Sequence, residues 1–270
     1  MKISGSLVLY QTSRDQYEAV IKSFLLASDD GDFYVMDNSQ LPSCSELFLH
    51  PRVKYKHIGK NIGFGAAHNQ AIKACCSNSD LHLIVNPDIC FDKESLDDMK
   101  QYFNLDSDLV AAMPKIKYPN GELQRLCKLL PTPVNLFVRR FIPISKIRNA
   151  MNVRYELHLL PQDHAIEVPT ISGCFLLARS KDLIAINGFD LRFFMYLEDV
   201  DLVRRLSSRG TIQYLPTSSV THAYAKGSYG NIKLLRYHIA SAVKYFYKWG
   251  WIFDDERARI NNRMLSKLNR

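Results

Sequence analysis

The sequence predicts an α/β fold in which a mixed, mainly parallel sheet is flanked by helices. Short apolar runs with the length of strands alternate with segments whose apolar residues have helical spacing. Three of these short runs also end in polar residues, as strands do at the edge where a parallel sheet binds its ligands. With 270 residues, 47% of them hydrophobic and 23% charged, the chain has the composition of one elaborated domain.

The first 113 residues hold the most regular part of the pattern. The expected strands are residues 6–10, 33–36, 53–58 and 81–85, and the expected helices are residues 16–26 and 66–74. A Gly-rich turn, residues 59–65, precedes the second helix. We expect this half to form βαβ units around a parallel sheet.

The pattern loosens between Pro114 and Pro169, where prolines interrupt it and basic residues gather. We expect this stretch to be a variable region folded over the sheet. Regular structure then returns in a strand at 170–179, a helix at 193–206, a strand at 212–215 and a helical end at 232–251. The basic residues that cluster in the variable region are Arg139, Arg140, Lys146 and Arg148.

Charge and cysteine usage narrow the class of protein. A net charge of +8 calls for nucleic acid, an anionic membrane or a phosphorylated substrate as partner. The six cysteines have no C-x-x-C or zinc-like spacing, which indicates buried free thiols in a reducing cytosol. The N-terminus lacks the order of a signal peptide, and no apolar stretch is long enough to cross a membrane. We therefore expect a cytoplasmic protein.

The polar strand ends are the first candidate site. Asp37 could accept hydrogen bonds from a base or a ribose, although Asp37-Asn38-Ser39 is also a common turn. In Asn86-Pro87-Asp88 a carboxylate follows a buried strand and could bind Mg²⁺ or Mn²⁺, with a plain turn as the alternative. Because such ends share one edge of a sheet, we expect them to lie together, with these polar residues: Gln11, Thr12, Asp37, Asn38, Asn86 and Asp88.

Two further segments carry possible chemistry. The turn from Gly59 to Gly65 could hold a phosphate at a helix N-terminus, or could be a structural turn; it matches neither the Walker nor the dinucleotide fingerprint. Glu198, Asp199 and Asp201 are three carboxylates within four residues. Their crowding invites raised pKa values or a metal, and a solvated helix face is the alternative. His222, after a strand, is a possible third metal ligand.

Taken in order, these motifs resemble the inverting family 2 glycosyltransferases of the GT-A fold, and among them the bacterial rhamnosyltransferases of O-antigen and cell-surface polysaccharide synthesis. The similarity spans about residues 4–225. It rests on the following segments: Val35–Ser39, Asn61–Gly65 with Asn69, Val85–Asp88, Ser172–Phe175 with Gly173, and Gly188–Leu202.

The resemblance implies a role for each matching residue. Asp37 resembles the residue that reads the base, and Asp88 the remaining carboxylate of the D-x-D metal motif, in which Asn86 replaces the first aspartate. Asp199 resembles the general base, with Glu198 as its substitute, and His222 the histidine that completes the metal site. The remaining donor-binding residues are Gln11, Thr12, Asn38, Asn61, Gly63, Phe64, Gly65, Asn69, Asn86 and Gly173.

The same resemblance implies an organisation and a reaction. Residues 1–225 would be the GT-A domain, divided into a nucleotide-binding half (1–113) and an acceptor-binding, catalytic half (114–225), followed by a basic aromatic helical tail, 226–270. A single displacement with Mg²⁺ or Mn²⁺ would move a sugar, with rhamnose from dTDP-rhamnose as first choice, to a saccharide on a polyprenyl diphosphate lipid. Basic, aromatic segments would then rest on the inner face of the membrane, unless they pack on the sheet.

Three alternatives stay open at this point. The donor could be a UDP-hexose, since the sequence does not fix the sugar. A nucleotidyltransferase would normally carry a Gly- and basic-rich loop after the first strand, where this chain has Tyr10-Gln11-Thr12-Ser13-Arg14. A nucleic-acid-binding protein would account for the charge, but the chain contains no recognised module, so we expect no nucleic-acid partner.

Overall fold

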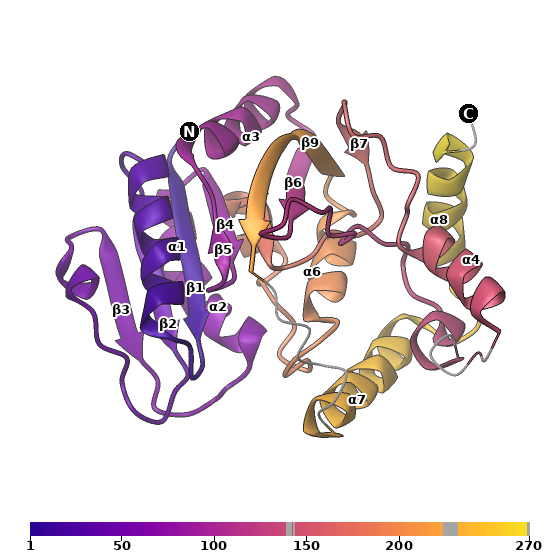
Figure 1. Ribbon diagram of the computed structural model, residues 1–270, viewed down its shortest axis with the longest axis horizontal. Helices are drawn as coiled ribbons and strands as arrows, with labels where there is room; N and C mark the ends of the chain where they lie inside the picture. The colour runs from indigo at the N-terminus through magenta and orange to yellow at the C-terminus, as the bar shows by residue number, and fades with distance from the viewer. Residues whose placement is uncertain (139–141, 143, 224–231, 269–270) are drawn as a thin grey trace.

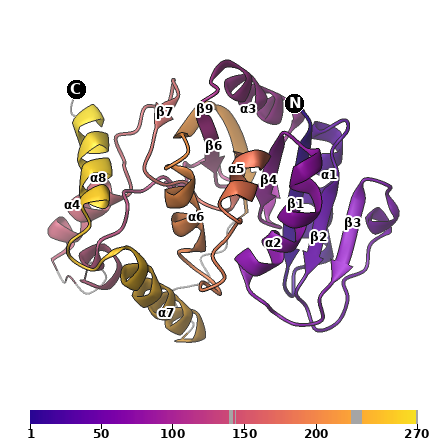
Figure 2. The same ribbon diagram turned by 180° about the vertical axis from the view of Figure 1, so that it is seen from behind.

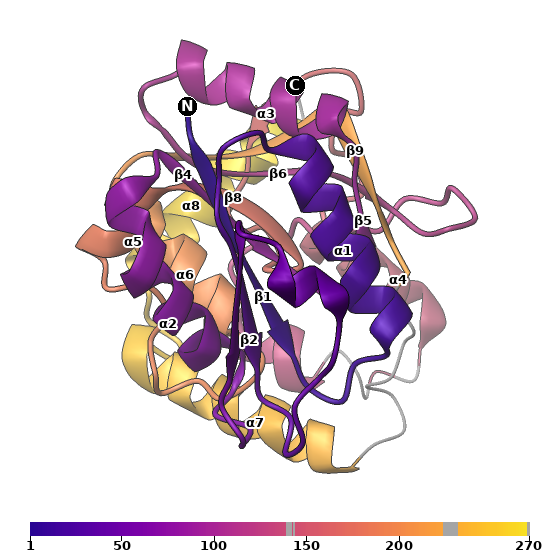
Figure 3. The same ribbon diagram turned by 90° about the vertical axis from the view of Figure 1, so that its left-hand side faces the viewer.

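The computed structural model describes residues 1–138, 142, 144–223 and 232–268. In this part of the chain a nine-stranded mixed sheet has the order β3-β2-β1-β4-β8-β6-β9-β5, and β7 pairs with β9 outside that order. Helices α1 and α3 cover one face, while α2, α5 and α6 cover the other (Figures 1, 2 and 3). The predicted fold class is confirmed.

The N-terminal half follows the sequence pattern closely. Strands β1 to β4 pair in parallel, and β1 and β4 are buried along their whole length, as strands covered by helices on both faces are. The observed bounds lie within a few residues of the expected ones: β1 (Ile3–Leu9), α1 (Arg14–Ala27), β2 (Phe33–Asp37), β3 (Val53–His57), α2 (Phe64–Cys75) and β4 (Leu81–Val85). Two short helices were not predicted, η1 (Glu46–Leu49) and η2 (Cys76–Asn78).

The second half completes the sheet with mixed pairing. Strand β8 is antiparallel to β4 and β6, whereas β6 and β9 are parallel. The variable region is not merely folded over the sheet, because it supplies the end of β6 and all of β7. The elements are β5 (Ile89–Cys90), α3 (Lys93–Leu105), β6 (Leu109–Lys117), η3 (Val134–Val138), α4 (Ser145–Tyr155), β7 (Ile166–Glu167), β8 (Phe175–Arg179), α5 (Ser180–Ala185), α6 (Glu198–Leu206) and β9 (Thr211–His222).

The sheet curls, and this curl determines which residues meet. Strand β5 begins only a few residues after β4, yet it pairs with β9 at the other end of the strand order. In that pairing Ile89 lies opposite His222. The segment that follows β4 is therefore brought against the end of β9.

Two predicted elements are shorter than expected. Strand β8 begins at Phe175, and α6 begins at Glu198 instead of residue 193. Before α6 the backbone is left-handed at Tyr196 (φ 68°) and Leu197 (φ 62°), which no helix allows. The apolar spacing of residues 193–197 reflects a loop whose Phe193 and Leu197 are buried against α7.

The tail contains two helices, α7 (Ile232–Trp249) and α8 (Asp255–Leu268). Tyr245 and Phe246 of α7 are buried in a cluster with residues of the loop before α6, so the tail packs on the domain. No described helix combines the length and the apolarity needed to cross a membrane. The six cysteines are free, as expected, but Cys44 and Cys90 are exposed and not buried.

Candidate active site

Three segments meet at the carboxyl end of β4. The N–H of Asn86 donates to the carbonyl of Cys174 (2.9 Å), and the N–H of Gly173 donates to Oδ2 of Asp199 (3.1 Å). A Cβ on Gly173 would lie 3.2 Å from Cβ of Asp199, so glycine permits this close approach. The structure thus joins the strand end, the loop before β8 and the start of α6.

Asp88 and His222 lie together at this edge. The side chain of His222 is almost fully buried, and its Nε2 lies 3.1 Å from Oδ1 of Asp88. The N–H of Ala223 also donates to the Asp88 carbonyl (2.8 Å). Among the described residues this Oδ1 is buried and accepts no hydrogen bond that would compensate for its loss of water.

Gln124 holds the histidine, and sequence reasoning did not identify it. Its Nε2 donates to the carbonyl of His222 (2.9 Å), which leaves its Oε1 facing Nδ1 of the same residue (2.8 Å). An amide oxygen can only accept, so Nδ1 of His222 carries a proton and donates it to Gln124, while Nε2 is directed toward Asp88. No pattern around Gln124 signals this role, because it depends on contact across 98 residues.

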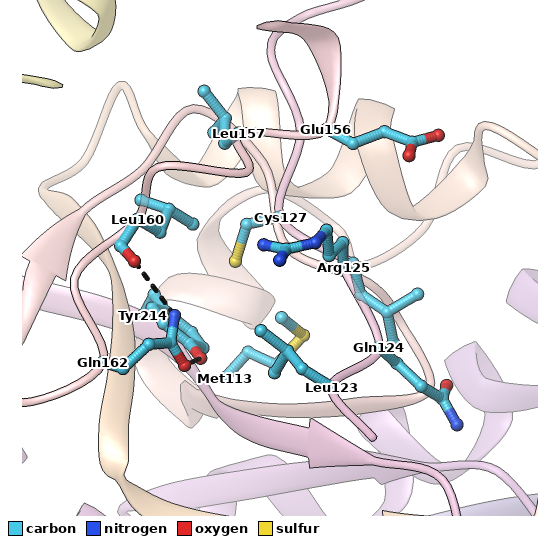
Figure 4. A pocket seen from close by; sticks show the side chains of 11 residues that line it. Met113, Leu123, Gln124, Arg125, Cys127, Glu156, Leu157, Leu160, Gln162 and Tyr214 are labelled. Carbon is cyan, nitrogen blue, oxygen red and sulfur yellow. Dashed lines mark hydrogen bonds between the residues drawn. The ribbon is translucent and has the colours of Figure 1, made fainter. Parts of the chain in front are cut away.

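Gln124 also borders a small pocket on the other side of its segment. The pocket is lined by side chains such as Cys127, Leu157 and Tyr214, and Figure 4 shows the amide of Gln124 turned away from it. Gln162 donates to the carbonyl of Leu160 across this pocket (3.0 Å). The pocket holds none of the predicted site residues and is a packing feature beneath the candidate site.

The Asp88 and His222 pair fits a divalent cation. The buried Oδ1 of Asp88 accepts no hydrogen bond in the described part of the chain and lies 3.1 Å from Nε2 of His222, and a bound cation would offset the cost of burying its charge. Adjacent ligands of octahedral Mg²⁺ lie roughly 3 Å apart, which is close to the separation here. Oxygen and imidazole ligands suit Mg²⁺ or Mn²⁺.

Asp199 and Glu198 lie side by side but differ in environment. Asp199 is half-buried, and its oxygens accept N–H bonds from Gly173 and from Val200 (2.8 Å). Glu198 is buried, and its Oε2 has no hydrogen bond among the described residues. Burial and the neighbouring charge of Asp199 raise the pKa of Glu198 to about 8.

Asp201 belongs to the scaffold. It is fully buried and bonds Arg205 (2.8 Å), the Lys248 ammonium (2.6 Å) and the Trp249 indole N–H (2.8 Å). These contacts fasten α6 to α7 and leave the carboxylate no free face. Of the three neighbouring carboxylates, Glu198 and Asp199 thus lie at the site, while Asp201 stabilises the packing of α6 on α7.

Asp37 is also used by the chain itself. It is buried and accepts bonds from the N–H groups of Ser39 (2.9 Å) and Ser43 (2.8 Å) and from the hydroxyl of Tyr55 (2.8 Å). Burial by itself would raise the pKa of Asp37, but these hydrogen bonds outweigh it and lower the pKa. The carboxylate fixes the loop after β2, and base reading stays a prediction.

The polar residues beside Asp37 support the same loop. The N–H of Gln11, which is left-handed (φ 52°), donates to the Ser39 hydroxyl (3.0 Å), and the Thr12 hydroxyl accepts from the N–H of Tyr10 (3.3 Å). Asn38 donates to the carbonyl of Gly63 (3.2 Å), and its own Oδ1 is buried with no hydrogen bond in the described part of the chain. Gln11, Thr12 and Asn38 therefore lie at the predicted edge.

The Gly-rich turn holds the loop that precedes α6. Gly63 has φ 93°, and a Cβ there would lie 2.5 Å from the Phe194 carbonyl. The Asn61 side chain caps the turn by accepting from the N–H of Gly63 (2.9 Å). The N–H of Phe64 donates to the Phe194 carbonyl (3.2 Å), and a Cβ on Gly65 would meet the Phe189 side chain at 2.7 Å. These glycines serve close packing, so a phosphate cradle stays a prediction.

Asn69 lies away from the carboxylates. Its amide donates to the carbonyl of Phe189 and accepts from the N–H of the same residue, both at 2.8 Å. Both ends of the amide are thus occupied within the chain, and donor binding by Asn69 stays a prediction.

A second group of metal-type ligands lies elsewhere. Cys75, Cys76 and His82 are buried with ligand atoms within 4.8 Å of one another. Both ring nitrogens of His82 already bond the hydroxyls of Ser4 and Ser6, at 2.8 Å each. His82 stands at the start of β4, away from the carboxyl end where Asp88 lies. This group is a buried polar network of the core.

Comparison with solved structures identifies the fold. GalNAc-T7, solved with UDP, GalNAc and Mn²⁺, aligns with 92% of this chain and 50% of its own at a TM-score of 0.64 and 12% identity. The mannosyltransferase PcManGT from Pyrobaculum calidifontis, solved with GDP-Man and Mn²⁺, aligns with 90% of this chain and 64% of its own at a TM-score of 0.58 and 12% identity. The chain has the GT-A glycosyltransferase fold. TarS from S. aureus gives a TM-score of 0.52 at 17% identity, over 82% of this chain and 60% of its own.

Comparison with curated sequences confirms the resemblance seen in the motifs. Rhamnosyltransferase WbbL of Escherichia coli is 26% identical over 247 residues, which are 85% of this chain and 88% of WbbL. The N-acetylglucosaminyl-diphospho-decaprenol L-rhamnosyltransferase of Mycobacterium tuberculosis is 27% identical over 183 residues, 64% of this chain. The alignment spans 59% of the mycobacterial protein. No family model matches the chain.

Proposed function

We propose that this chain is an inverting glycosyltransferase that moves a sugar from a nucleotide donor to a saccharide acceptor. The observation that carries the proposal is the meeting of Asp88, His222 and Asp199 at one edge of a GT-A sheet. The names of the two relatives make rhamnose from dTDP-rhamnose the first donor to test, with UDP-hexoses as the alternative.

In the proposed reaction Asp199 takes the proton of the acceptor hydroxyl while that oxygen attacks the anomeric carbon. The new glycosidic bond forms as the bond to the nucleoside diphosphate breaks, which inverts the anomeric centre. Asp88 and His222 would hold Mg²⁺ or Mn²⁺, which offsets negative charge on the departing diphosphate. Glu198 is the less available base, because a pKa of about 8 leaves it mostly protonated at neutral pH.

For the acceptor we propose a saccharide carried on a polyprenyl diphosphate lipid at the cytoplasmic face of the membrane. The name of the mycobacterial relative specifies an N-acetylglucosaminyl-diphospho-decaprenol acceptor, which supports this class. The net charge of +8 is compatible with diphosphate groups and an anionic surface.

The test starts with thermal stabilisation by dTDP or UDP, with and without Mn²⁺, against a single-stranded oligonucleotide. We expect a nucleotide with Mn²⁺ to raise the melting temperature, as any ligand of the folded state does. Transfer from dTDP-rhamnose and from UDP-hexoses to a lipid-linked saccharide then identifies the donor. Stabilisation by the oligonucleotide alone would overturn the proposal and favour a nucleic-acid-binding protein.

A further inference from the structure

The turn between α7 and α8 presents apolar side chains to water. Ile252 is 78% exposed and Phe253 is 90% exposed, and Trp251 lies next to them in the chain. Single exposed apolar residues are common, but consecutive ones on a structured turn mark an interaction surface.

The turn is built to hold these side chains outward. Gly250 is left-handed (φ 100°), and a Cβ there would lie 2.4 Å from the Phe253 carbonyl. The buried guanidinium of Arg257 donates to the carbonyls of Gly250 (3.3 Å), Trp251 (3.3 Å) and Ile252 (3.1 Å). Arg257 therefore satisfies the polar backbone of the turn from inside, so only apolar side chains need a partner outside.

The apolar surface continues onto neighbouring elements. The ring of Phe137 in η3 stacks on Trp251, with centroids 6.2 Å apart, and Val134 and Val138 of η3 are exposed. Helix α4, which follows η3 in the chain, exposes Ile147. The end of α7, η3 and α4 lie at one end of the molecule, at the lower right of Figure 1. We name this surface the apolar end.

The segments that lead to the apolar end contain no acidic residues over long stretches. The sequence contains no Asp or Glu between Pro131 and Tyr155, and none between Asp201 and Asp254. Of the cations in the first stretch, Lys146 and Arg154 are described and exposed, while Arg139 and Arg140 lie outside the described residues.

Of the three acidic residues that follow the turn, Asp255 is exposed, while Asp254 and Glu256 form ion pairs. Asp254 is buried and pairs with Arg204 (2.6 Å), and Glu256 pairs with the same guanidinium (3.0 Å). Exposed aromatic and aliphatic groups framed by cations are complementary to an anionic bilayer, whose headgroups attract the cations while the interface takes up the apolar side chains.

We propose that the apolar end docks this chain on an anionic lipid bilayer, with Ile252 and Phe253 entering the interface. The inference rests on the proposed function for its purpose, since a lipid-linked acceptor has to be reached at the membrane. Helix α7 also contacts the loop before the candidate base: the Ser241 hydroxyl donates to the Met195 carbonyl (2.7 Å), and the rings of Tyr237 and Phe194 lie 4.9 Å apart. One helix thus borders both the docking surface and the site.

The experiment is flotation of the full chain with vesicles of phosphatidylcholine alone or with phosphatidylglycerol. We expect binding to the anionic vesicles only, weakened by salt. The double variant I252S/F253S should bind about tenfold or more weakly, since it removes the inserted apolar surface. The matched control L49S/L105S removes two leucines that are 86% exposed on other elements and should bind as the wild type does. K146E/R154E should lose the preference for anionic vesicles.

Equal binding of I252S/F253S and the wild type, or equal binding to both vesicle types, would overturn the proposal. A dimer in solution that the same double variant dissociates would also overturn it and assign the apolar end to a second copy. Stabilisation by dTDP and Mn²⁺ separates this inference from the proposed function. If the wild type binds nucleotide but no vesicles, only the docking proposal is wrong. If it binds anionic vesicles but no nucleotide, only the proposed transferase function is wrong.

Discussion

Asp88 and Asp199 lie at the same edge of the sheet, but different parts of the chain hold them. Asp88 faces His222 of β9, whose ring is fixed by Gln124; we call these three residues the metal-side cluster. Asp199 is bound by the N–H of Val200 at the start of its own helix and by the N–H of Gly173 in the loop before β8. The first centre depends on side chains from distant parts of the chain, and the second on backbone N–H donors, one local and one 26 residues away.

The difference has a physical reason. Binding of a cation at the metal-side cluster requires ligand side chains held in one orientation, and here other side chains provide that support. A base requires a carboxylate held in one orientation, which backbone donors at a helix start provide. Substitutions in the metal-side cluster should therefore change metal binding, whereas substitution of Asp199 should change the rate of transfer.

The largest expected effect is on the rate of sugar transfer. Asp199→Asn should lower transfer by about 10³-fold, because the amide cannot take the acceptor proton, while stabilisation by nucleotide and Mn²⁺ persists. Rates are measured with the donor that the wild type uses. Asp201→Asn is the matched control: it should lower stability by about 3 kcal/mol by leaving buried cations without their carboxylate, as read from denaturant unfolding. Transfer by Asp199→Asn near the wild-type rate would remove Asp199 as the base.

The next effect is on metal binding. Asp88→Ala and His222→Ala should each weaken Mn²⁺ binding by roughly 100-fold, since each removes one of two ligands, and isothermal titration with Mn²⁺ measures this. Asp92→Ala supplies the control, because Asp92 only caps α3 by accepting from the N–H of Ser95 (2.8 Å). That variant should keep its Mn²⁺ affinity. A wild-type titration that shows no Mn²⁺ binding, or variants at Asp88 and His222 that bind Mn²⁺ as the wild type does, would contradict the metal assignment.

A smaller effect on Mn²⁺ binding is expected from Gln124, which orients His222 and does not itself bind the metal. Gln124→Leu should weaken Mn²⁺ binding by about tenfold, because the His222 ring loses the partner that fixes its tautomer. Gln124→Glu keeps an acceptor for Nδ1 and should restore part of the affinity. If the leucine and glutamate variants bind Mn²⁺ equally, Gln124 acts only in packing.

The smallest effect is on the pH dependence of stability. The pKa of Glu198 is about 8 in the folded chain, above its ordinary value of 4.5, so the folded state binds more protons between these values. Stability should therefore fall as pH rises from about 4.5 to 8. Glu198→Gln should flatten this slope and raise the melting temperature at pH 9 by roughly 5 °C, measured by calorimetry. A slope that the variant leaves unchanged would contradict the burial of a titrating Glu198.

Much of the fold follows from local pattern. The strands and helices of the first 113 residues are read from apolar spacing, because βαβ units bury each element against its chain neighbours. The same logic failed at residues 193–197, where apolar spacing belongs to a loop with two left-handed residues. Apolar spacing indicates which side chains are buried but not the backbone conformation. The loop at residues 193–197 packs on α7 and buries Phe193 and Leu197, as a helix could.

The sequence by itself determined the α/β class, the polar strand ends and the order of the acidic motifs, because each is written within a few adjacent residues. Only the tertiary structure decided that Asp88 meets His222, since the curl of the sheet pairs β5 with β9. It also decided that Gln124 fixes the histidine and that Asp201 joins α7 while Asp199 stays at the site. These outcomes depend on contacts between residues far apart in the chain, which no local periodicity encodes.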